Sequence, residues 1–340
     1  MPAPSLLPLR PLTSNDTVLL TGATGHVGGA VARFLLSERE CGVRALVRSP
    51  EKAGWLESLG AEIVKGDLAG DLSAAVVGCQ VVIHAAASVT SDGDWAVMRE
   101  VNVEGSKRLA QAAALEGVER FVHVSTCSVY GSPQRLDIDE TSPRQYKGEP
   151  YTDTKVDAEV AVEQVAKGSD MGLVMPRPTQ VYGPGSYNFT VRPVEMIKLK
   201  QMVLINNGRH LTKPIYIDDA AVGISMCAEA SVPNGAAYNI TMGVGVPWQV
   251  FLSHYGRMLG VDSFVSVPRW LGWLAALGFE AKAKLTGGEA GLSRGALQAL
   301  VSDNTFSAEL AANELGFRAM VGLDEGMEKT ETWLRETGLL

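Results

Sequence analysis

Short apolar runs alternate with longer amphipathic stretches through the first half of the chain. The runs predict strands, and the stretches between them predict helices, because their apolar residues recur at helical spacing. Apolar strands separated by helices are typical of a parallel sheet covered on both faces. Right-handed crossovers make such a sheet doubly wound, with its ligand across the carboxyl ends of the strands. The predicted strands are 18–21, 43–47, 61–64, 80–84, 121–125 and 173–175, and the predicted helices are 27–36, 95–115 and 151–166.

The pattern loosens after Pro176, where prolines, glycines and short mixed segments follow one another up to two further predicted helices, 306–315 and 323–336. We expect an α/β protein with a Rossmann-type doubly wound parallel sheet and a smaller mixed C-terminal substrate-binding lobe. The expected division is a flexible N-terminal arm at 1–15, a dinucleotide-binding domain at 16–183, and a mostly substrate-binding lobe at 184–340. A segment around 214–228 is expected to return to the first domain.

Composition excludes several classes of protein. The 340 residues carry a formal net charge of −8, which argues against a nucleic-acid partner. The cysteines Cys41, Cys79, Cys127 and Cys227 are scattered without a C-x-x-C pair or metal spacing, which predicts reduced thiols, a cytoplasmic setting and no metal site. The first dozen residues lack the apolar core of a signal peptide, and no stretch approaches the ~20 apolar residues that span a bilayer.

A glycine-rich segment joins the first predicted strand to the first predicted helix. Its glycines Gly22, Gly25 and Gly28 stand three apart in T-G-A-T-G-H-V-G. Glycines at these places allow a tight turn, a close approach of the backbone to a pyrophosphate, and close packing of helix on strand. The free N–H groups at the start of the helix favour a negative ligand. The segment therefore predicts a dinucleotide site.

A tyrosine and a lysine four residues apart, Tyr151 and Lys155, share one face of the predicted helix 151–166. A phenol is a poor base near neutral pH, because its usual pKa is about 10, and a neighbouring ammonium favours its ionised form. Such a pair suits proton exchange with an alcohol or ketone while a hydride moves. The hydroxyls of Ser125 and Thr126 end a predicted strand, so we expect them at the carboxyl edge, beside the reacting oxygen.

Together these residues resemble the extended short-chain dehydrogenase/reductase family (the NAD-dependent epimerase/dehydratase superfamily), in particular its branch of 3β-hydroxysteroid dehydrogenases and dihydroflavonol-reductase-like enzymes. The resemblance covers about residues 16–335 and depends on motifs that stand in the family's order. These motifs are T-G-A-T-G-H-V-G at 21–28, D-L at 67–68, H-A-A-A at 84–87, N-V-E-G at 102–105, S-T-C-S-V-Y-G at 125–131, Y-T-D-T-K at 151–155 and R-P-T-Q-V-Y-G-P at 177–184.

The resemblance implies a role for each motif. Thr126 would position the substrate oxygen, Tyr151 would exchange the proton, and Lys155 would lower the pKa of Tyr151 and hold the nicotinamide ribose. Asn102 would support the helix and the site. The implied cofactor-binding residues are Gly22, Thr24, Gly25, His26, Val27 and Gly28 at the pyrophosphate, Asp67 and Leu68 at the adenine, Ala85, Ala86 and Ala87 beneath the ribose, Tyr151 and Lys155, and Pro178 and Val181 beside the nicotinamide.

The end of the second predicted strand bears on the choice of cofactor. NAD-specific members usually carry an acid there for the ribose hydroxyls, and this chain has Arg48. A guanidinium binds a 2′-phosphate bidentately and can stack on adenine. Arg48 therefore favours NADP(H). Because Glu51 could serve the ribose instead, NAD(H) stays open.

Two segments bear on the substrate. Nucleotide-sugar enzymes often carry an arginine in G-x-G-x-x-R-D-F-I-Y-V-x-D, and here Thr212 stands at that position, with Lys213 or Arg209 left to compensate. The apolar segment 267–279 favours a flap over an apolar molecule, a peripheral membrane contact, or part of the lobe's core.

We therefore expect an NAD(P)-dependent enzyme that moves hydride between nicotinamide and a secondary alcohol or ketone on a largely apolar, steroid- or terpenoid-like small molecule. The alternatives are a nucleotide-sugar epimerase or dehydratase and a non-catalytic NAD(P)-sensing regulatory protein. Cys127 and Ser128 stand where dehydratases usually show an acidic pair, which argues against dehydration. The resemblance also implies a homodimer through the helices 95–115 and 151–166, in the cytoplasm or associated with a membrane surface.

Overall fold

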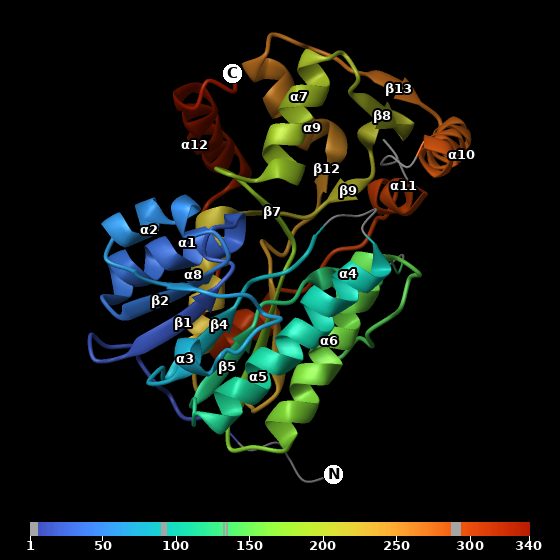
Figure 1. The fold of residues 1–340 in the computed structure, drawn as a ribbon. Helices are drawn as coiled ribbons and strands as arrows, with labels where there is room; N and C mark the ends of the chain where they lie inside the picture. The colour runs from blue at the N-terminus through green and yellow to red at the C-terminus, as the bar shows by residue number, and fades with distance from the viewer. Residues whose placement is uncertain (1–5, 90–93, 132, 134, 287–293) are drawn as a thin grey trace.

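Figure 1 shows the computed structural model, which describes residues 6–89, 94–131, 133, 135–286 and 294–340. Within these residues, a sheet of seven strands runs in the order β11-β6-β5-β4-β1-β2-β3, and every neighbouring pair is parallel. Its strands are β1 (Thr17–Thr21), β2 (Gly42–Val47), β3 (Glu62–Lys65), β4 (Val81–His84), β5 (Arg120–His123), β6 (Gly172–Pro178) and β11 (Ala236–Ile240). This arrangement confirms the predicted Rossmann-type α/β fold.

Helices cover both faces of the sheet (Figure 1). On one face α1 (His26–Phe34) packs against α8 (Ile217–Glu229), and on the other α5 (Gly105–Leu115) packs against α6 (Pro150–Lys167). The central strands β4, β5 and β6 are therefore buried along their whole length, as their apolar runs predict. Besides the interrupted helix described next, the first half of the chain also contains the short helices η1 (Leu35–Arg39), η2 (Pro50–Lys52), α2 (Gly54–Ser58), α3 (Ser73–Val76) and η4 (Cys127–Tyr130).

The predicted long helix 95–115 is interrupted by a π-helical turn. It consists of α4 (Trp95–Arg99), η3 (Glu100–Glu104) and α5, and the wide turn η3 contains the buried Asn102. The Asn102 side chain accepts a hydrogen bond from the Ser88 amide at 2.7 Å and donates to the Ser88 carbonyl and the Thr154 hydroxyl, each at 3.0 Å. Asn102 thereby holds the loop after β4 against α6.

The second half of the chain forms a smaller group of short elements beyond the carboxyl edge of the sheet (Figure 1). Three of its segments lie with the sheet instead: β11 pairs with β6, α8 packs against α1, and η7 (Ala311–Leu315) contacts both β11 and α8. The other elements are β7 (Gln180–Tyr182), η5 (Tyr187–Val191), α7 (Arg192–Lys198), β8 (Val203–Ile205), η6 (Asn206–Gly208), β9 (Leu211–Thr212), β10 (Pro214–Tyr216), β12 (Val246–Pro247), α9 (Trp248–Met258), β13 (Val265–Val267), α10 (Arg269–Thr286), α11 (Arg294–Leu300) and α12 (Leu323–Glu336).

One predicted helix is shorter than its sequence pattern indicates. The predicted helix 306–315 contains only a short helical stretch that ends in η7, because its first residues are extended. The Ile138 amide donates to the Thr305 carbonyl, and the Ser307 amide donates to the Ile138 carbonyl. Phe306 is thus held in a β-bridge and buried against Tyr130 instead of starting a helix.

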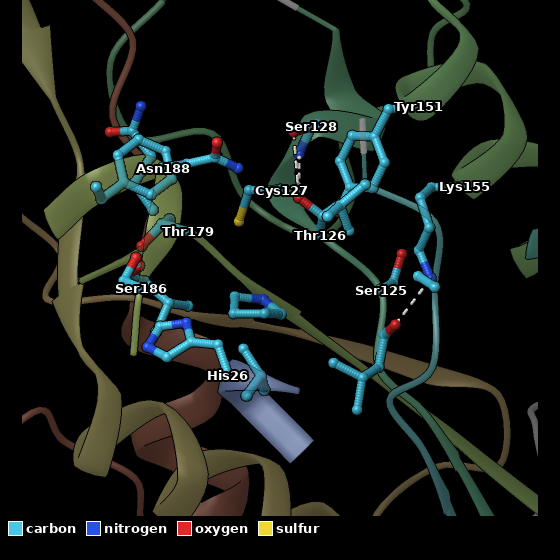
Figure 2. A pocket seen from close by; sticks show the side chains of 18 of the residues that line it. His26, Ser125, Thr126, Cys127, Ser128, Tyr151, Lys155, Thr179, Ser186 and Asn188 are labelled. Carbon is cyan, nitrogen blue, oxygen red and sulfur yellow. Dashed lines mark hydrogen bonds between the residues drawn. The ribbon is translucent and has the colours of Figure 1, made fainter. Parts of the chain in front are cut away.

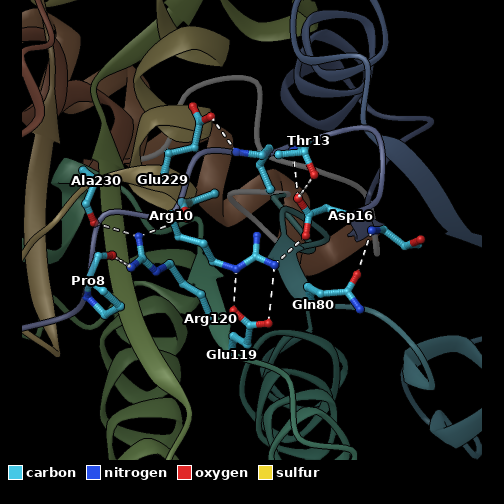
Figure 3. Close-up of polar contacts among 12 residues, drawn as sticks. Pro8, Arg10, Thr13, Asp16, Gln80, Glu119, Arg120, Glu229 and Ala230 are labelled. Atoms are coloured by element: carbon cyan, nitrogen blue, oxygen red, sulfur yellow. Dashed lines mark hydrogen bonds and ion pairs between the residues drawn. The ribbon is translucent and has the colours of Figure 1, made fainter.

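The expected flexible arm, in its described part, contacts the amino ends of the strands β5 and β6 (Figure 3). Leu7 and Leu12 are buried, and the Leu7 amide donates to the Val232 carbonyl at 2.7 Å. Arg120 donates to the carbonyls of Pro8, Ala228 and Ala230 at 2.7–3.0 Å. These backbone and apolar contacts join residues 6–15 to segments far along the chain, which local composition does not reveal. Residues 1–5 lie outside the described residues.

Within the described part of the chain, no helix combines the length and the apolar character needed to cross a bilayer.

Candidate active site

The glycine-rich turn after β1 fits a pyrophosphate. Gly22 has a φ of +74°, which glycine adopts without strain, and a Cβ on Gly28 would lie 2.3 Å from the Gly22 carbonyl oxygen. Helix α1 follows with no side-chain cap and no acidic residue in its first turn. Its N–H groups and its dipole therefore favour an anion. This turn can hold the phosphates of a dinucleotide.

Two buried polar atoms beside this turn have no partner in the described structure, His26 Nε2 and Thr179 Oγ1. Both residues line the same cavity (Figure 2). Burial and the charge of Arg33 lower the pKa of His26 to about 4, so its ring is neutral at physiological pH. A buried polar group without a partner costs free energy, and both atoms suit contacts to a polar ligand.

Thr126 ends the loop after β5 and caps the short helix η4. Its Oγ1 accepts from the Ser128 amide at 3.1 Å and lies at the same distance from the Ser128 hydroxyl, and either of these two hydroxyls can donate to the other. Thr126 is 8% exposed and faces the cavity beside Tyr151 (Figure 2). The Thr126 oxygen is therefore held in place at the carboxyl edge, where its hydroxyl can donate a hydrogen bond to a substrate oxygen.

Tyr151 and Lys155 lie one turn apart near the start of α6, and both side chains border the cavity (Figure 2). The Lys155 Nζ donates to the Val124 carbonyl at 2.8 Å and lies 3.4 Å from His123 Nε2. Burial lowers the pKa of Lys155 to about 8, although the Glu159 carboxylate opposes this shift. Burial raises the pKa of Tyr151, and a hydrogen bond with Thr126 partly offsets the rise. At neutral pH, then, Lys155 is charged and Tyr151 keeps its proton.

A buried ion pair joins α6, the helix that carries Tyr151 and Lys155, to β6. Arg177 on β6 donates to both carboxylate oxygens of Glu159 on α6, at 2.8 and 2.6 Å, and to the Tyr130 hydroxyl at 2.8 Å. Burial raises the pKa of Glu159, but the hydrogen bonds and charge of Arg177 more than offset this, so its pKa lies below the usual value. The pair fixes α6, and with it Lys155, against the sheet.

The glycine turn and the hydroxyl-bearing residues line one cavity of about 620 Å³. The structure brings most of the sequence-predicted site residues together there: Gly22, Gly25, His26, Val27, Gly28, Ala85, Ala87, Thr126, Tyr151, Lys155, Pro178 and Val181. A nicotinamide and a substrate of moderate size fit a space of this size. Among the described residues, no group of His, Cys, Asp or Glu is arranged to hold a metal ion.

Five predicted cofactor residues lie outside the cavity lining. Thr24, Arg48 and Asp67 are exposed, and Arg48 and Asp67 follow the neighbouring strands β2 and β3 at the same carboxyl edge. Leu68 is buried, with its side chain against Gly105 of α5, and the Ala86 amide donates to the Thr21 hydroxyl at 3.2 Å. Arg48 and Asp67 thus stand on the surface beyond the glycine turn, where the adenosine half of a dinucleotide would extend.

Sequence reasoning missed most of the cavity wall that the second half of the chain contributes. Ser186, Tyr187, Asn188 and Phe189 come from the turn and helix after β7, and Ala299, Ser302, Asn304 and Phe306 come from the end of α11 and the segment after it. The first group directly follows the R-P-T-Q-V-Y-G-P motif, which could have indicated it. The second group carries no motif, and only the folded lobe places it at the site.

Comparisons with known proteins agree with this geometry. The sequence model of the NAD dependent epimerase/dehydratase family matches residues 18–241. The 4-hydroxy-2-methyl-3-oxo-4-farnesyl-3,4-dihydroquinoline-1-oxide ketoreductase of Stigmatella aurantiaca is 30% identical over 328 residues, which are 94% of this chain and 96% of that protein. The 3-beta-hydroxysteroid dehydrogenase of Mycolicibacterium neoaurum is 30% identical over 266 residues, which are 74% and 69% of the two chains.

The fold also matches solved structures of nucleotide-sugar enzymes. The UDP-glucose 4-epimerase of Thermotoga maritima, solved with UDP-glucose, gives a TM-score of 0.77 at 20% sequence identity and covers 94% of this chain and 99% of that one. At this identity the likeness shows a common fold.

Proposed function

This chain belongs to the NAD dependent epimerase/dehydratase family of extended short-chain dehydrogenases/reductases, and we propose that it transfers hydride between nicotinamide and a secondary alcohol or ketone on a largely apolar molecule. Membership confirms the family that the motif order predicts, and the protein is an NAD(P)-dependent oxidoreductase. One observation carries the proposal: a single cavity is lined by the glycine turn and by Thr126, Tyr151 and Lys155.

The proposed reaction divides the chemistry between cofactor and protein. A bound NAD(P)H supplies the hydride for the substrate carbon. Tyr151 donates its phenolic proton to the ketone oxygen, and the Thr126 hydroxyl donates a hydrogen bond to the same oxygen. The charge of Lys155 stabilises the phenolate that remains. In the oxidation direction the Tyr151 phenolate accepts the proton of the alcohol.

The proposed cofactor site extends from the cavity onto the surface of the sheet's edge. The residues from Gly22 to Gly28 would hold the pyrophosphate, Ala85 to Ala87 would lie beneath the ribose, and Pro178 and Val181 would border the nicotinamide. Asp67 and Leu68 would contact the adenine. Arg48 is exposed at the end of β2, where its guanidinium can pair with a 2′-phosphate, and this supports NADP(H) over NAD(H).

The surroundings of Thr212 support an apolar substrate over a nucleotide sugar. Thr212 occupies the position of the diphosphate-binding arginine, is fully buried, and donates to the Gln180 side chain. No cation stands at position 212 itself, and the neighbouring Lys213 has two of its three N–H donors bonded to carbonyls, which leaves one for a single anionic group. The two relatives are named for a farnesyl-dihydroquinoline-1-oxide and for a 3-beta-hydroxysteroid, and these names also favour an apolar substrate.

Helix α10 supports a peripheral membrane contact of a cytoplasmic protein. It packs against the apolar cluster of Ile205, Leu297 and Val301, and directs six large apolar side chains outward: Trp270, Leu271, Trp273, Leu274, Leu277 and Phe279. The segment after the neighbouring α11 lines the cavity, so a lipid-dissolved substrate would enter beside this face.

Co-sedimentation with phosphatidylcholine vesicles tests the membrane contact. The wild-type protein is expected to sediment with the vesicles, and the double variant Trp270→Gln, Leu274→Gln is expected to stay in the supernatant. If the wild-type protein also stays in the supernatant, the membrane contact is contradicted.

The resemblance to the family favours a homodimer through the helices 95–115 (α4 to α5) and 151–166 (α6). Trp95 and Val97 on α4 and Leu115 at the end of α5 are large apolar side chains that remain exposed, Leu115 at 87%. A second copy of the chain would bury them. Analytical ultracentrifugation is expected to give the mass of a dimer, whereas a monomer at every concentration would contradict this part of the proposal.

Cofactor titration followed by turnover tests the proposed function. Nicotinamide fluorescence is expected to show tighter binding of NADPH than of NADH, and Arg48→Ala is expected to weaken NADPH binding at least tenfold with NADH binding unchanged. The protein with NADPH is then expected to reduce members of a panel of ketosteroids and terpenoid ketones. Turnover of a nucleotide sugar without net change of the cofactor would instead establish the epimerase alternative. Cofactor binding with no turnover of any kind would favour a nucleotide-sensing protein.

A further inference from the structure

The charges along the cavity are of one sign. Among the described residues that line it, the charged side chains are Lys147, Lys155 and Lys213, and no aspartate or glutamate joins them. Lys155 is used by the proposed reaction. Lys147 and Lys213 have no part in it, and the phosphates of the cofactor have their own site at the start of α1.

Lys213 is the less exposed of the two and is held in a fixed position. It lies between β9 and β10 with 6% of its surface exposed. Its Nζ donates to the Leu211 carbonyl at 3.0 Å and to the Ser302 carbonyl at 3.1 Å. An ammonium has three donors, so these two carbonyls leave one N–H for a ligand. Neither carbonyl carries a charge that would balance the ammonium.

The nearby charges leave this ammonium only partly compensated. Burial lowers the pKa of Lys213 to about 8, the charge of Asp303 opposes the shift, and the charge of Lys147 adds to it. Asp303 is half exposed, and its carboxylate accepts from the His210 ring at 2.9 Å and from the Leu211 amide at 3.2 Å. At neutral pH Lys213 is therefore a buried cation that also experiences the charge of Lys147.

Lys147 approaches from the opposite domain, on the loop that leads into α6. Its Nζ lies 3.2 Å from the Glu149 carboxylate, and its side chain is 16% exposed. The charge of Lys147 lowers the pKa of Lys213, and an anion bound at Lys213 would oppose this effect. Lys147 and Lys213 thus line one cavity from segments that are far apart in the sequence.

We propose that the substrate carries an anionic group, a carboxylate or a phosphate, which Lys213 and Lys147 bind while its ketone faces Thr126 and Tyr151. This inference rests on the proposed function and refines its substrate class, from a neutral apolar ketone to an apolar oxo acid or oxo phosphate ester. The cavity wall near Lys213 supplies both kinds of contact that such an amphiphile needs, because Ser302 and Asn304 are polar and Phe306 is apolar.

Ligand binding tests the proposal without requiring turnover. The NADPH-loaded protein is titrated by calorimetry with octanoate, octyl phosphate and octan-1-ol, which share one chain length and differ in charge. At least one anion is expected to bind about tenfold tighter than the alcohol, since a charge-assisted hydrogen bond contributes that much or more. The tighter of the two anions identifies the group as carboxylate or phosphate.

Variants assign the preference to the lysines. Lys213→Met is expected to remove most of the tenfold preference and to leave octan-1-ol binding and NADPH binding unchanged, and Lys147→Met is expected to reduce it. Lys167→Met, at the exposed end of α6, is the control and should change nothing. If Lys213→Met fails to fold by circular dichroism, Lys147→Met decides the outcome.

The proposal is overturned if octan-1-ol binds as tightly as both anions, or if the lysine variants keep the preference. Reduction of neutral ketones by a protein without anion preference would leave the proposed function standing and remove this inference alone. Conversely, if the wild-type protein prefers anions through these lysines but reduces no ketone, the result contradicts the proposed function alone.

Discussion

At the scale of single residues, the charge of Lys155 is the property on which the proposed proton transfer depends. Burial brings its pKa down to about 8, while Tyr151, with a raised pKa, keeps its proton through the same range. The rate of ketone reduction should therefore fall as the pH rises through about 8, because Lys155 loses the charge that stabilises the phenolate. A pH profile of kcat for the reduction checks this. Lys155→Met should be slow at every pH and lack this falling limb.

The contribution of Lys155 to folding stability changes with pH in the direction opposite to its effect on the reduction rate. A falling rate caused by loss of the Lys155 charge can therefore be distinguished from a falling rate caused by unfolding. Between about 8 and the usual lysine value of 10.5, the unfolded chain binds the proton of Lys155 and the folded chain does not. The contribution of Lys155 to folding stability therefore increases as the pH rises through this window. Thermal denaturation at each pH supplies the comparison. A rate that stays level from pH 7 to 9 would contradict the assignment of Lys155.

The buried pair of Arg177 and Glu159 is the residue-scale feature with the largest expected effect on stability. Both residues are almost fully buried, and the pair is bidentate. Arg177→Met leaves the Glu159 carboxylate without its main partner and is expected to cost about 3–5 kcal/mol of unfolding free energy. Denaturant unfolding measures this. The exposed pair of Arg335 and Glu331 is the control, and Arg335→Met should cost less than about 1 kcal/mol.

At the scale of elements, the turn from β1 into α1 depends on close contact between backbones. Gly28→Ala places a methyl group 2.3 Å from the Gly22 carbonyl oxygen, so the turn must shift. NADPH affinity is expected to fall at least tenfold, with a loss of about 1–3 kcal/mol in stability. Gly54→Ala, in α2, meets nothing within 4 Å and should keep full affinity. NADPH binding of Gly28→Ala equal to that of Gly54→Ala would contradict the role of the turn.

The sheet and its helices could be predicted from the sequence because their signals are local. The buried strands β1 and β4 each contain a run of three apolar residues, and the helix α12 starts and ends where its apolar spacing predicts. Strand β11 was not predicted, since its residues Ala236–Ile240 follow the loosened pattern after Pro176 and become a strand only by pairing with β6. The π turn η3 likewise depends on contacts of Asn102 that local spacing does not encode.

At the scale of the whole molecule, the cavity shows which parts of a site a sequence can reveal. The glycine turn and the triad of Thr126, Tyr151 and Lys155 are contiguous motifs at the ends of strands, and the structure gathers them as their order predicts. Part of the opposite wall, including Asn304 and Phe306, comes from segments more than a hundred residues later. Only tertiary packing brings these segments to the carboxyl edge, so no local pattern indicated them.

The central claim, that Tyr151 provides the proton for hydride transfer to a ketone, is tested most directly by Tyr151→Phe. Oxidation of NADPH is followed by absorbance with a ketone that the wild-type protein reduces, and NADPH binding is measured in parallel. Removing the phenolic proton should lower kcat by about 10²–10⁴-fold with NADPH affinity kept, as for loss of a general acid. Full turnover by Tyr151→Phe on the same ketone would contradict the account.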